Sequence, residues 1–242
     1  MSTTRLIICG AFGRMGQATA KLAARDRSFS ITAGVTLDPY ATPPAPFPVI
    51  PLAELDDYAE KSDVWIDFTS PEASAYYAER AAYFKKKIVI GTTGHNPTQL
   101  KAIQKAAKKT AVLMTPNFSL GMNALFQISE YAAAVLRGYE PRIQETHHIH
   151  KKDSPSGSAK RLAALVEKAA KLKQPVSIES FRQGETVGDH NLILEGPFEA
   201  VRISHSAKSR SAFAQGALQG ALRLKSKKPG LYDLNDLFKI SA

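Results

Sequence analysis

Histidines and lysines gather between residues 145 and 158, where the sequence reads Glu-Thr-His-His-Ile-His-Lys-Lys-Asp-Ser-Pro-Ser-Gly-Ser. Imidazole titrates near neutral pH and moves protons, and an ammonium group both holds an anion and donates a proton. The Ser-Pro-Ser-Gly-Ser segment is typical of the beginning of a helix, where backbone N–H groups bind anions. These residue types in this order predict a site that protonates and clamps a small carboxylated substrate.

The helix expected after this run sets the anion site. Pro155 suits the first helical turn, with Ser154 as the capping residue before it. The backbone N–H groups of Ser156, Gly157 and Ser158 then lack helical partners and can hold one carboxylate, helped by the positive end of the helix dipole. Glycine at position 157 also allows a ligand to approach the backbone closely.

A metal site is the main chemical rival at the same residues. His147, His148, His150 and Asp153 all carry atoms that bind zinc. The neighbouring lysines oppose a cation, however, and neither an HExxH spacing nor a cysteine ligand is present. We therefore expect no metal, and we assign no role to His150. If the adjacent histidines lie on a strand, they point to opposite faces, and one of them can serve packing alone.

The first half of the chain alternates solid apolar runs with helical patterns. This pattern predicts a parallel sheet covered on both faces by helices. The segment 38–51 contains six prolines and is expected to be a loop. The expected strands are 6–9, 30–37, 64–66, 88–90 and 111–114, and the expected helices are 13–25, 52–61, 71–84 and 97–109.

Four non-helical motifs follow these strands directly. They are Gly10–Gly16, Asp67–Pro71, Gly91–Gly94 and Thr115–Gly121. Ligands of open parallel sheets bind at the carboxyl ends of the strands. The four motifs should therefore converge on one edge of the sheet and form a binding site there.

The pattern changes after Gly121, where helices accompany runs that look antiparallel. We therefore expect an α/β chain with a Rossmann-like parallel-sheet domain, residues 1–118 and 209–242. We expect a second α+β domain with a mainly antiparallel sheet in residues 119–208. The expected elements of the second half are helices to about 137, 155–171 and 211–224, and strands 142–147, 176–182, 190–194 and 200–205.

The segment Gly10-Ala-Phe-Gly-Arg-Met-Gly16 joins the first strand to the first helix. Small residues let the backbone turn tightly and approach a pyrophosphate, and the helix N-terminus favours its charge. The spacing is Gly-x-x-Gly-x-x-Gly, whereas the usual fingerprint is Gly-x-Gly-x-x-Gly. In its strand–turn–helix setting it predicts a dinucleotide, and a helix that simply begins at a glycine turn is the alternative.

The second expected strand ends near Asp38, where an acidic residue usually holds the adenine ribose hydroxyls. The next residues, Pro39 and Tyr40, are not basic, so a 2′-phosphate would meet a carboxylate without an obvious cation. Arg14 could compensate only in part. We therefore expect NADH to be favoured over NADPH.

Composition limits the class of protein. The formal net charge is +10, but the densest lysine runs stand at the ends of expected helices, where they complement the dipole. No nucleic-acid module and no basic–aromatic interleaving is present, so no nucleic-acid partner is expected. The sequence shows neither a run of about 18 apolar residues nor a signal peptide, and Cys9 is the single cysteine. We expect no membrane association and a cytoplasmic location.

Over nearly the whole chain the sequence resembles the 4-hydroxy-tetrahydrodipicolinate reductases, also called dihydrodipicolinate reductases. The resemblance implies NAD(P)H-dependent reduction of 4-hydroxy-tetrahydrodipicolinate to tetrahydrodipicolinate in diaminopimelate and lysine biosynthesis. The substrate is a cyclic imine with two carboxylates, and the family is usually tetrameric through its second domain. The motifs that carry the resemblance are Gly10–Gly16, Asp67-Phe68-Thr69, Gly91-Thr92-Thr93-Gly94, Pro116–Gly121 and Glu145–Ser158, with Ser204-His205 and Ser209-Arg210 before the final helix.

The resemblance also implies residue roles. His147 matches the family's catalytic proton donor and acceptor, and Lys151 matches its second proton donor. His148 and the pair Gly157-Ser158 match substrate contacts, with serine at position 158 where threonine is commoner. The implied cofactor-binding residues, with Asp38 added from its position, are Gly10, Ala11, Phe12, Gly13, Arg14, Met15, Asp38, Gly91, Thr92, Thr93, Thr115, Pro116, Asn117 and Phe118.

Three other functions compete with this interpretation. Another imine or amino-acid dehydrogenase on the same plan would not need the His-His-x-His-Lys-x-Asp-x-Pro-Ser-Gly run. A non-catalytic nucleotide-binding regulator would have no use for His147 and Lys151 as proton donors. A nucleic-acid binder would lose affinity steeply with added salt.

Overall fold

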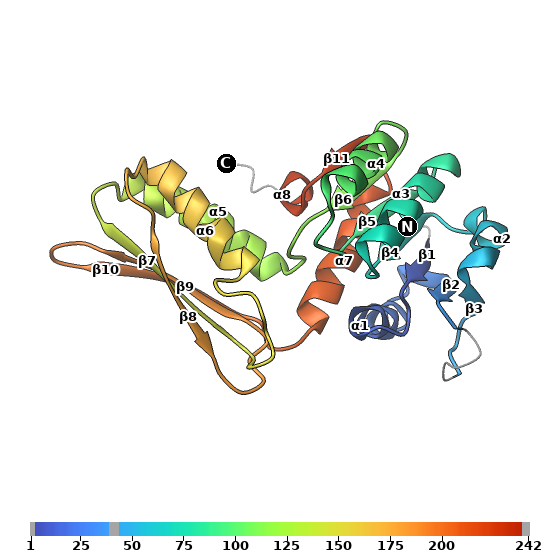
Figure 1. Ribbon diagram of the computed structural model, residues 1–242, viewed down its shortest axis with the longest axis horizontal. Coiled ribbons are helices and arrows are strands. Elements are labelled where there is room, and N and C mark those ends of the chain that lie inside the picture. Colours follow the sequence, from blue (N-terminus) through green and yellow to red (C-terminus); the bar gives the residue numbers. More distant parts are fainter. Residues whose placement is uncertain (1–2, 39–43, 239–242) are drawn as a thin grey trace. The chain divides into compact units, whose positions relative to one another are not determined.

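Figure 1 shows a computed structural model of the protein, which describes residues 3–38 and 44–238. The chain forms two compact units, one of residues Met1–Phe118 with Phe213–Ala242 and one of residues Ser119–Ala212. The expected return to the first domain was at residue 209, four residues earlier. Each unit has its own sheet and its own core.

The first unit is built on a seven-stranded sheet in which every neighbouring pair is parallel. The predicted parallel α/β fold is therefore confirmed. In spatial order the strands are β11 (Gly230–Tyr232), β6 (Ala111–Met114), β5 (Lys87–Ile90), β4 (Val64–Asp67), β1 (Thr4–Cys9), β2 (Phe29–Thr36) and β3 (Val49–Pro51).

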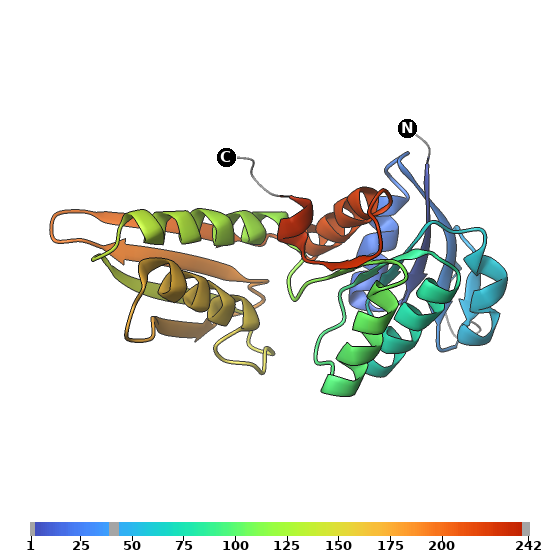
Figure 2. The same ribbon diagram turned by 90° about the horizontal axis from the view of Figure 1, so that it is seen from above.

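Both faces of this sheet are apolar because helices cover both. The row of Ile7, Trp65, Ile88 and Val112 packs in one core with α2 (Leu55–Ala59), α3 (Pro71–Tyr83) and α4 (Pro97–Ala107). On the other face Ile8 packs against α1 (Arg14–Ala23), and Leu113 lies against Gly220 of α7 (Ser211–Leu224). Figure 2 shows α3 and α4 side by side on their face of the sheet. The period-2 alternation of the strands and the 3.6-residue period of the helices account for this layering.

Three short elements of the first unit were missed from the sequence. The strand β3 lies within the segment predicted to be loop, directly follows Pro48 and ends with Pro51. A strand at the edge of a sheet tolerates proline because one side of its backbone has no ladder to complete. The strand β11 and the helix α8 (Leu234–Leu237) are three and four residues long, too short to show a periodic pattern.

The second unit holds a mixed sheet in the order β10 (Ala200–Ser206), β9 (Asp189–Glu195), β7 (Glu140–His147) and β8 (Ser177–Arg182). Two of its three pairs are antiparallel, as predicted, while β7 and β8 are parallel. The helix α6 (Gly157–Ala170) connects β7 to β8, and parallel neighbours need such a crossover. Helices α5 (Leu120–Val135) and α6 cover one face, over a core that includes Ile143, Leu162 and Leu192.

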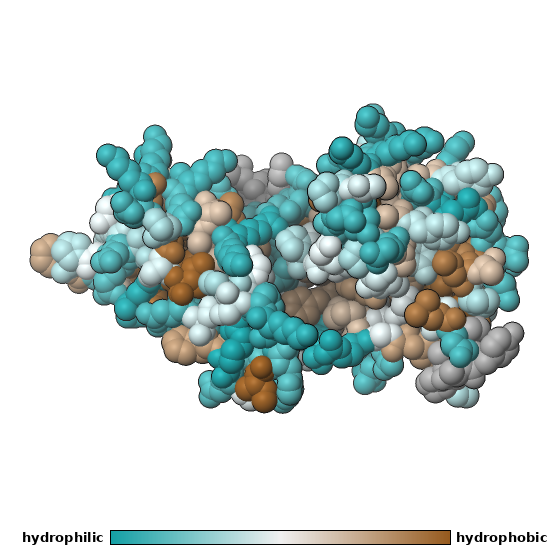
Figure 3. All heavy atoms as spheres, viewed as in Figure 1, coloured by the Kyte–Doolittle hydropathy of each residue, from teal (hydrophilic) through white to brown (hydrophobic). Residues whose placement is uncertain are grey.

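The face of the molecule in Figure 3 is predominantly hydrophilic. On the face shown in Figure 3, teal side chains prevail over both units, and brown ones form small separate groups. No contiguous apolar area dominates this face, in line with the usual surface of a globular protein. Among the residues that the structure describes, none of the helices has both the length and the apolar character needed to cross a bilayer.

Candidate active site

The loops of the first unit meet at the carboxyl edge of its sheet. Cys9 pairs with Asp67, Asp67 pairs with Ile90, and Ile90 pairs with Met114 across three neighbouring strand pairs. Because these four residues form one row, the segments that follow them leave the sheet at the same edge. The structure thus brings the four predicted motifs to one place.

The glycine-rich loop forms a tight cradle at the N-terminus of α1. Gly10 has a φ of +77°, and a Cβ there would lie 2.6 Å from the carbonyl oxygen of Phe68. A Cβ on Gly16 would lie 2.0 Å from the carbonyl oxygen of Gly10. Gly13 is the N-cap of α1, and no side chain caps that end of the helix. A bare helix N-terminus beside a compact glycine turn fits the pyrophosphate of a dinucleotide.

A buried carboxylate ties two of these loops together. Asp67 is fully buried and accepts hydrogen bonds from the hydroxyls of Thr69 and Thr92, the latter at 2.7 Å. The Thr92 hydroxyl also accepts the backbone N–H of Thr69 at 2.9 Å. Burial raises the pKa of Asp67, and the two hydroxyl hydrogen bonds oppose that rise. The carboxylate therefore fixes the loop after β4 against the loop after β5.

Two cavities of about 410 Å³ each open among these loops. The first is lined by Gly10, Phe12 and Gly13 from the glycine-rich loop, and by Leu37 and Tyr77 among others. The second is lined by four other residues from the predicted cofactor set, Thr92, Thr93, Thr115 and Pro116. Seven predicted cofactor residues do not line either cavity, namely Ala11, Arg14, Met15, Asp38, Gly91, Asn117 and Phe118.

Four of these seven residues lie where they can be described without reference to a cavity. Ala11 and Phe118 are buried, and a Cβ on Gly91 would lie 2.0 Å from the Phe68 ring. Asp38 is exposed and comes two residues after the end of β2. Its position at the carboxyl end of the second strand is the one that the sequence predicted.

In the second unit, His147 is held against a buried glutamate. Both residues belong to β7, two positions apart, so their side chains share the face covered by the helices. Nδ1 of His147 lies 2.7 Å from Oε2 of Glu145, and the glutamate is completely buried. Burial lowers the pKa of His147, Glu145 opposes this, and Lys151 and Arg182 reinforce it. The imidazole is thus neutral in the pH range above its ordinary pKa.

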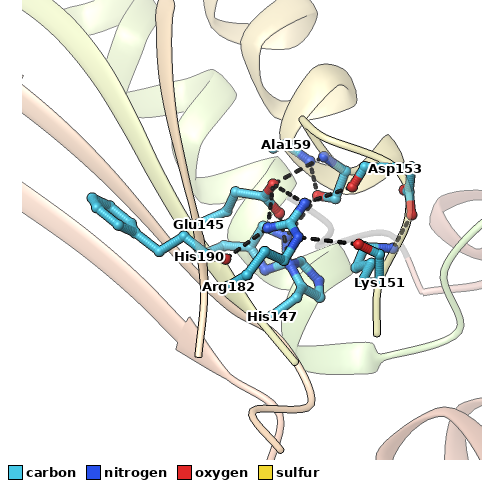
Figure 4. A network of polar contacts seen from close by, with 9 residues as sticks. Glu145, His147, Lys151, Asp153, Ala159, Arg182 and His190 are labelled. Carbon is cyan, nitrogen blue, oxygen red and sulfur yellow. Dashed lines mark hydrogen bonds and ion pairs between the residues drawn. The ribbon is translucent and has the colours of Figure 1, made fainter. Parts of the chain in front are cut away.

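Arg182 joins this pair to the loop that carries Lys151. Its guanidinium donates to Oε1 of Glu145 at 3.4 Å and to the backbone carbonyls of Lys151 at 3.4 Å and Asp153 at 2.5 Å. Nζ of Lys151 lies 2.8 Å from the carboxylate of Asp153. Figure 4 shows these side chains converging from β7, β8 and the loop before α6. The two candidate proton donors therefore belong to one polar network.

The N-terminus of α6 differs from the prediction. Ser156, not Ser154, is the N-cap, and its hydroxyl accepts the N–H of Ala159 at 3.1 Å. The N–H of Ser156 is not available to a ligand because it donates to Oε1 of Glu145 at 3.0 Å. Against the effect of burial, the pKa of Asp153 is lowered, chiefly by Lys151, and the backbone of Gly157 contributes to the lowering. The acidic side chain of Asp153 thus lies close to the helix end where the sequence predicted a substrate carboxylate.

Ser156→Ala should lower the free energy of unfolding by about 0.5–2 kcal/mol, the usual cost of losing a serine N-cap. Ser154→Ala is the matched control, since Ser154 is exposed and does not cap the helix. Urea unfolding of the two variants measures the difference. Equal losses, or a larger one for Ser154→Ala, would contradict the helix boundary.

Sequence reasoning missed three side chains of this network, Glu145, Arg182 and His190. His190 on β9 is cross-strand partner of Glu145, is 2% exposed, and meets the His147 ring edge-on at 5.2 Å between centroids. Burial, with His147 beside it, lowers the pKa of His190 to about 4. Because side chains alternate between the two faces of a strand, the sequence could have placed Glu145 and His147 on the same face of β7. The register of β7 with β8 and β9, which brings Arg182 and His190 beside them, cannot be read from the sequence.

His147, His148, His150 and Asp153, the residues of the rival metal interpretation, do not form a cluster of donors among the described residues. Glu145, His147 and His190 do, with one donor atom from each within 4.8 Å of the others. Arg182 already donates to that glutamate, and Lys151 is also close. Their positive charges oppose a cation here, as the lysines did in the sequence.

Comparisons with known proteins agree on the family. Residues 4–118 match the model of the dihydrodipicolinate reductase N-terminus, and residues 121–238 match that of the C-terminus. The 4-hydroxy-tetrahydrodipicolinate reductase of Caldanaerobacter subterraneus subsp. tengcongensis is 38% identical, over 97% of this chain and 98% of its own. That of Aquifex aeolicus is 34% identical over 97% and 98%.

Solved structures share the fold. A dipicolinate-bound dihydrodipicolinate reductase from Paenisporosarcina sp. TG-14 superposes with a TM-score of 0.83 at 22% identity, over 96% of this chain and 98% of that one. A diaminopimelate dehydrogenase from C. glutamicum reaches 0.65 at 15% identity, over 100% and 97%. The matches to both family models, with relatives 38% and 34% identical over nearly their whole length, show that this chain belongs to the dihydrodipicolinate reductase family.

Proposed function

We propose that this protein is an enzyme that reduces 4-hydroxy-tetrahydrodipicolinate to tetrahydrodipicolinate with NADH or NADPH, in diaminopimelate and lysine biosynthesis. The observation that carries the proposal is the cluster of His147, Lys151 and the N-terminus of α6 in one unit. It occurs in a chain that matches the reductase family over both halves.

The first unit holds the cofactor, whose nicotinamide supplies the hydride when bound. The glycine-rich loop, residues 10–15, binds the pyrophosphate with the backbone N–H groups at the start of α1. Residues 91–93 and 115–118 lie along the nicotinamide half, where the second cavity opens. The hydrogen bond from Thr92 to Asp67 holds the loop of residues 91–93, which lines the second cavity, in place.

The second unit holds the substrate and moves protons. Lys151 binds a substrate carboxylate and donates a proton, and in doing so it exchanges Asp153 for the substrate as its ionic partner. Only one proton accompanies the hydride, and His147 is the second group that can donate or relay it, a role worth roughly 10²–10⁴-fold in rate. His148, Gly157 and Ser158 complete the substrate contacts at the end of α6. No metal takes part in this scheme.

We propose that NADH is the preferred cofactor, because the exposed carboxylate of Asp38 suits ribose hydroxyls and repels a 2′-phosphate. The ratio of kcat/KM for NADH and NADPH should favour NADH. Asp38→Ala should bring the ratio closer to one, either by raising kcat/KM for NADPH or by lowering kcat/KM for NADH. A tenfold preference for NADPH in the unchanged protein would refute the idea.

We also propose that the enzyme works in the cytoplasm as a homotetramer. The buried Cys9 is a free thiol, which suits a reducing compartment. The tetramer is implied by the family alone, and light scattering of the purified protein at assay concentration tests it.

One coupled assay tests the reaction. The substrate is generated in place by a synthase from pyruvate and aspartate semialdehyde, this protein is added, and absorbance at the reduced-cofactor band is followed with NADH and with NADPH. Oxidation that depends on all components is expected. No oxidation of either cofactor would defeat the proposal. Turnover of diaminopimelate in place of the imine would instead favour the dehydrogenase alternative.

A further inference from the structure

We propose that Glu145 is a positioning residue that sets the tautomer and the plane of His147, so that Nδ1 carries the fixed proton and Nε2 is the nitrogen that exchanges protons. The idea rests on the proposed function for its kinetic consequences. Its geometric basis lies wholly within the second unit.

The first argument is that the two carboxylate oxygens of Glu145 have different partners. Oε1 of Glu145 accepts from the N–H of Ser156 and from Arg182, while Oε2 lies 2.7 Å from Nδ1 of His147. Oε1 is thus committed to two donors that keep the carboxylate in place. Oε2 faces the imidazole, and an ionised carboxylate accepts hydrogen bonds only. The two atoms do not form an in-line hydrogen bond, but the negative charge 2.7 Å away favours a proton on the ring nitrogen beside it.

The second argument is electrostatic. Burial raises the pKa of Glu145, but hydrogen bonds from Ser156 and the nearby His147 outweigh it and bring the pKa below its usual value. The carboxylate is therefore ionised at neutral pH. The imidazole beside it has a lowered pKa and is neutral, so it holds one proton, and Glu145 places that proton on Nδ1.

The third argument concerns the other nitrogen. Nε2 lies beside Gly188, where an added Cβ would stand 3.0 Å from it. Glycine at this position leaves Nε2 uncovered by a side chain. The His190 ring packs against the same ring in a T-shaped arrangement, with 5.2 Å between the ring centroids. The ring thus has Glu145 beside Nδ1, His190 packed against it, and a glycine in place of a larger side chain beside Nε2.

The charged groups around His147 come from every element packed against it. Glu145 faces it from β7, Arg182 from β8 and His190 from β9, and Lys151 and Asp153 face it from the loop before α6. Of these, Glu145 is the nearest negative charge. Removing it leaves the positive charges of Lys151 and Arg182 less balanced, and the pKa of His147 should fall further.

The test compares Glu145→Gln with Glu179→Gln. Glu179 stands on β8, is exposed, and accepts from Gln144 at 2.8 Å, so it is a matched carboxylate outside the network. Long-range ¹H–¹⁵N NMR of the imidazoles reads the tautomer and pKa of His147 without any assay of activity. We expect Nδ1–H in the unchanged protein and in Glu179→Gln. In Glu145→Gln we expect loss of that tautomer or its mixture with Nε2–H, and a lower His147 pKa.

Kinetic measurements distinguish a Glu145 that acts through His147 from a Glu145 that only stabilises the fold. Glu145→Gln should lower kcat by at least about tenfold, and by no more than His147→Gln does, because it acts through that residue. In a His147→Gln background the same change should have little further effect. Gly188→Ala should lower kcat while keeping the Nδ1–H tautomer, because the added Cβ would lie nearest to Nε2, at 3.0 Å, and not against Nδ1.

Several results would overturn the proposal. One is an Nε2–H tautomer of His147 in the unchanged protein, and a second is an unaltered tautomer in Glu145→Gln. A third is a loss of kcat from Glu145→Gln that is as large in the His147→Gln background as in the unchanged protein. An inactive but Nδ1-protonated enzyme would refute the proposed reaction and leave the positioning role intact. If Glu145→Gln does not fold, the tautomer of the unchanged protein and the Gly188→Ala kinetics still decide.

Discussion

His147→Gln is expected to lower kcat of the imine reduction by roughly 10²–10⁴-fold, the usual contribution of a positioned acid or base. The glutamine cannot take up and release a proton near neutral pH, although its size lets it pack against Glu145 and His190. Affinity for the reduced cofactor should remain nearly unchanged, because the residue belongs to the unit that does not carry the glycine-rich loop. Steady-state kinetics with a separate fluorescence titration of the cofactor measures both quantities.

His150→Gln is the matched control. It lies three residues away, its side chain is 71% exposed, and its nearest acidic partner, Glu185, is 3.7 Å distant and also exposed. It should retain full turnover. Lys151→Ala should behave like His147→Gln, with a rise in KM as well, because it also removes a carboxylate contact. Full turnover in His147→Gln or Lys151→Ala would remove the role assigned to that residue.

Gly16→Ala is expected to destroy the cofactor cradle. Its Cβ would lie 2.0 Å from the carbonyl oxygen of Gly10 and 2.8 Å from the backbone of Ala11, and no flexible side chain can yield there. The loop must move away from α1, so the N–H groups at the helix start lose their alignment. We expect at least about tenfold weaker cofactor binding, and a loss of stability of about 1–3 kcal/mol from overpacking.

Lys21→Ala on the same helix is the control for Gly16→Ala. Lys21 is exposed in the last turn, away from the loop, and its removal should change cofactor affinity little. Calorimetric titration with NADH and thermal unfolding separate binding from stability. Unchanged affinity in Gly16→Ala would show that the glycine-rich loop does not hold the cofactor.

Local patterns predicted the fold wherever a segment was a clear apolar run or a periodic helix. Four strands of the first sheet, β1, β4, β5 and β6, are such runs, and they were located from Leu6, Trp65, Ile88 and Val112 and their neighbours. The strands β3 and β11 have three residues each, include proline or glycine, and did not stand out as apolar runs. Their existence is decided by pairing with strands already in place.

The candidate site could be predicted only in part for a different reason. His147 and Lys151 stand in one short run, and their chemistry is evident from residue type. The groups that control them come from other strands. Arg182 and His190 lie 35 and 43 positions beyond His147 (182 − 147 and 190 − 147), and only the register of β7 with β8 and β9 brings them together. Register depends on the whole sheet and on its turns, which one strand's pattern does not reveal.

The cap of α6 shows how a local rule can choose the wrong serine. Ser154 and Ser156 both precede plausible helix starts, and Pro155 suits a first helical turn. The helix begins at Gly157 because the Ser156 N–H is bound by Glu145, a tertiary contact from β7. Capping preferences depend only on neighbouring residues in the sequence, so they do not include this tertiary hydrogen bond.

The most direct measurement is a crystal structure with NADH and a dicarboxylate analogue of the cyclic imine bound together. Nε2 of His147 and Nζ of Lys151 should lie about 2.6–3.2 Å from the analogue or from one bridging water. The reduced pyridine ring should face the same analogue. Both side chains turned toward solvent or another subunit, with the analogue held elsewhere, would contradict the account.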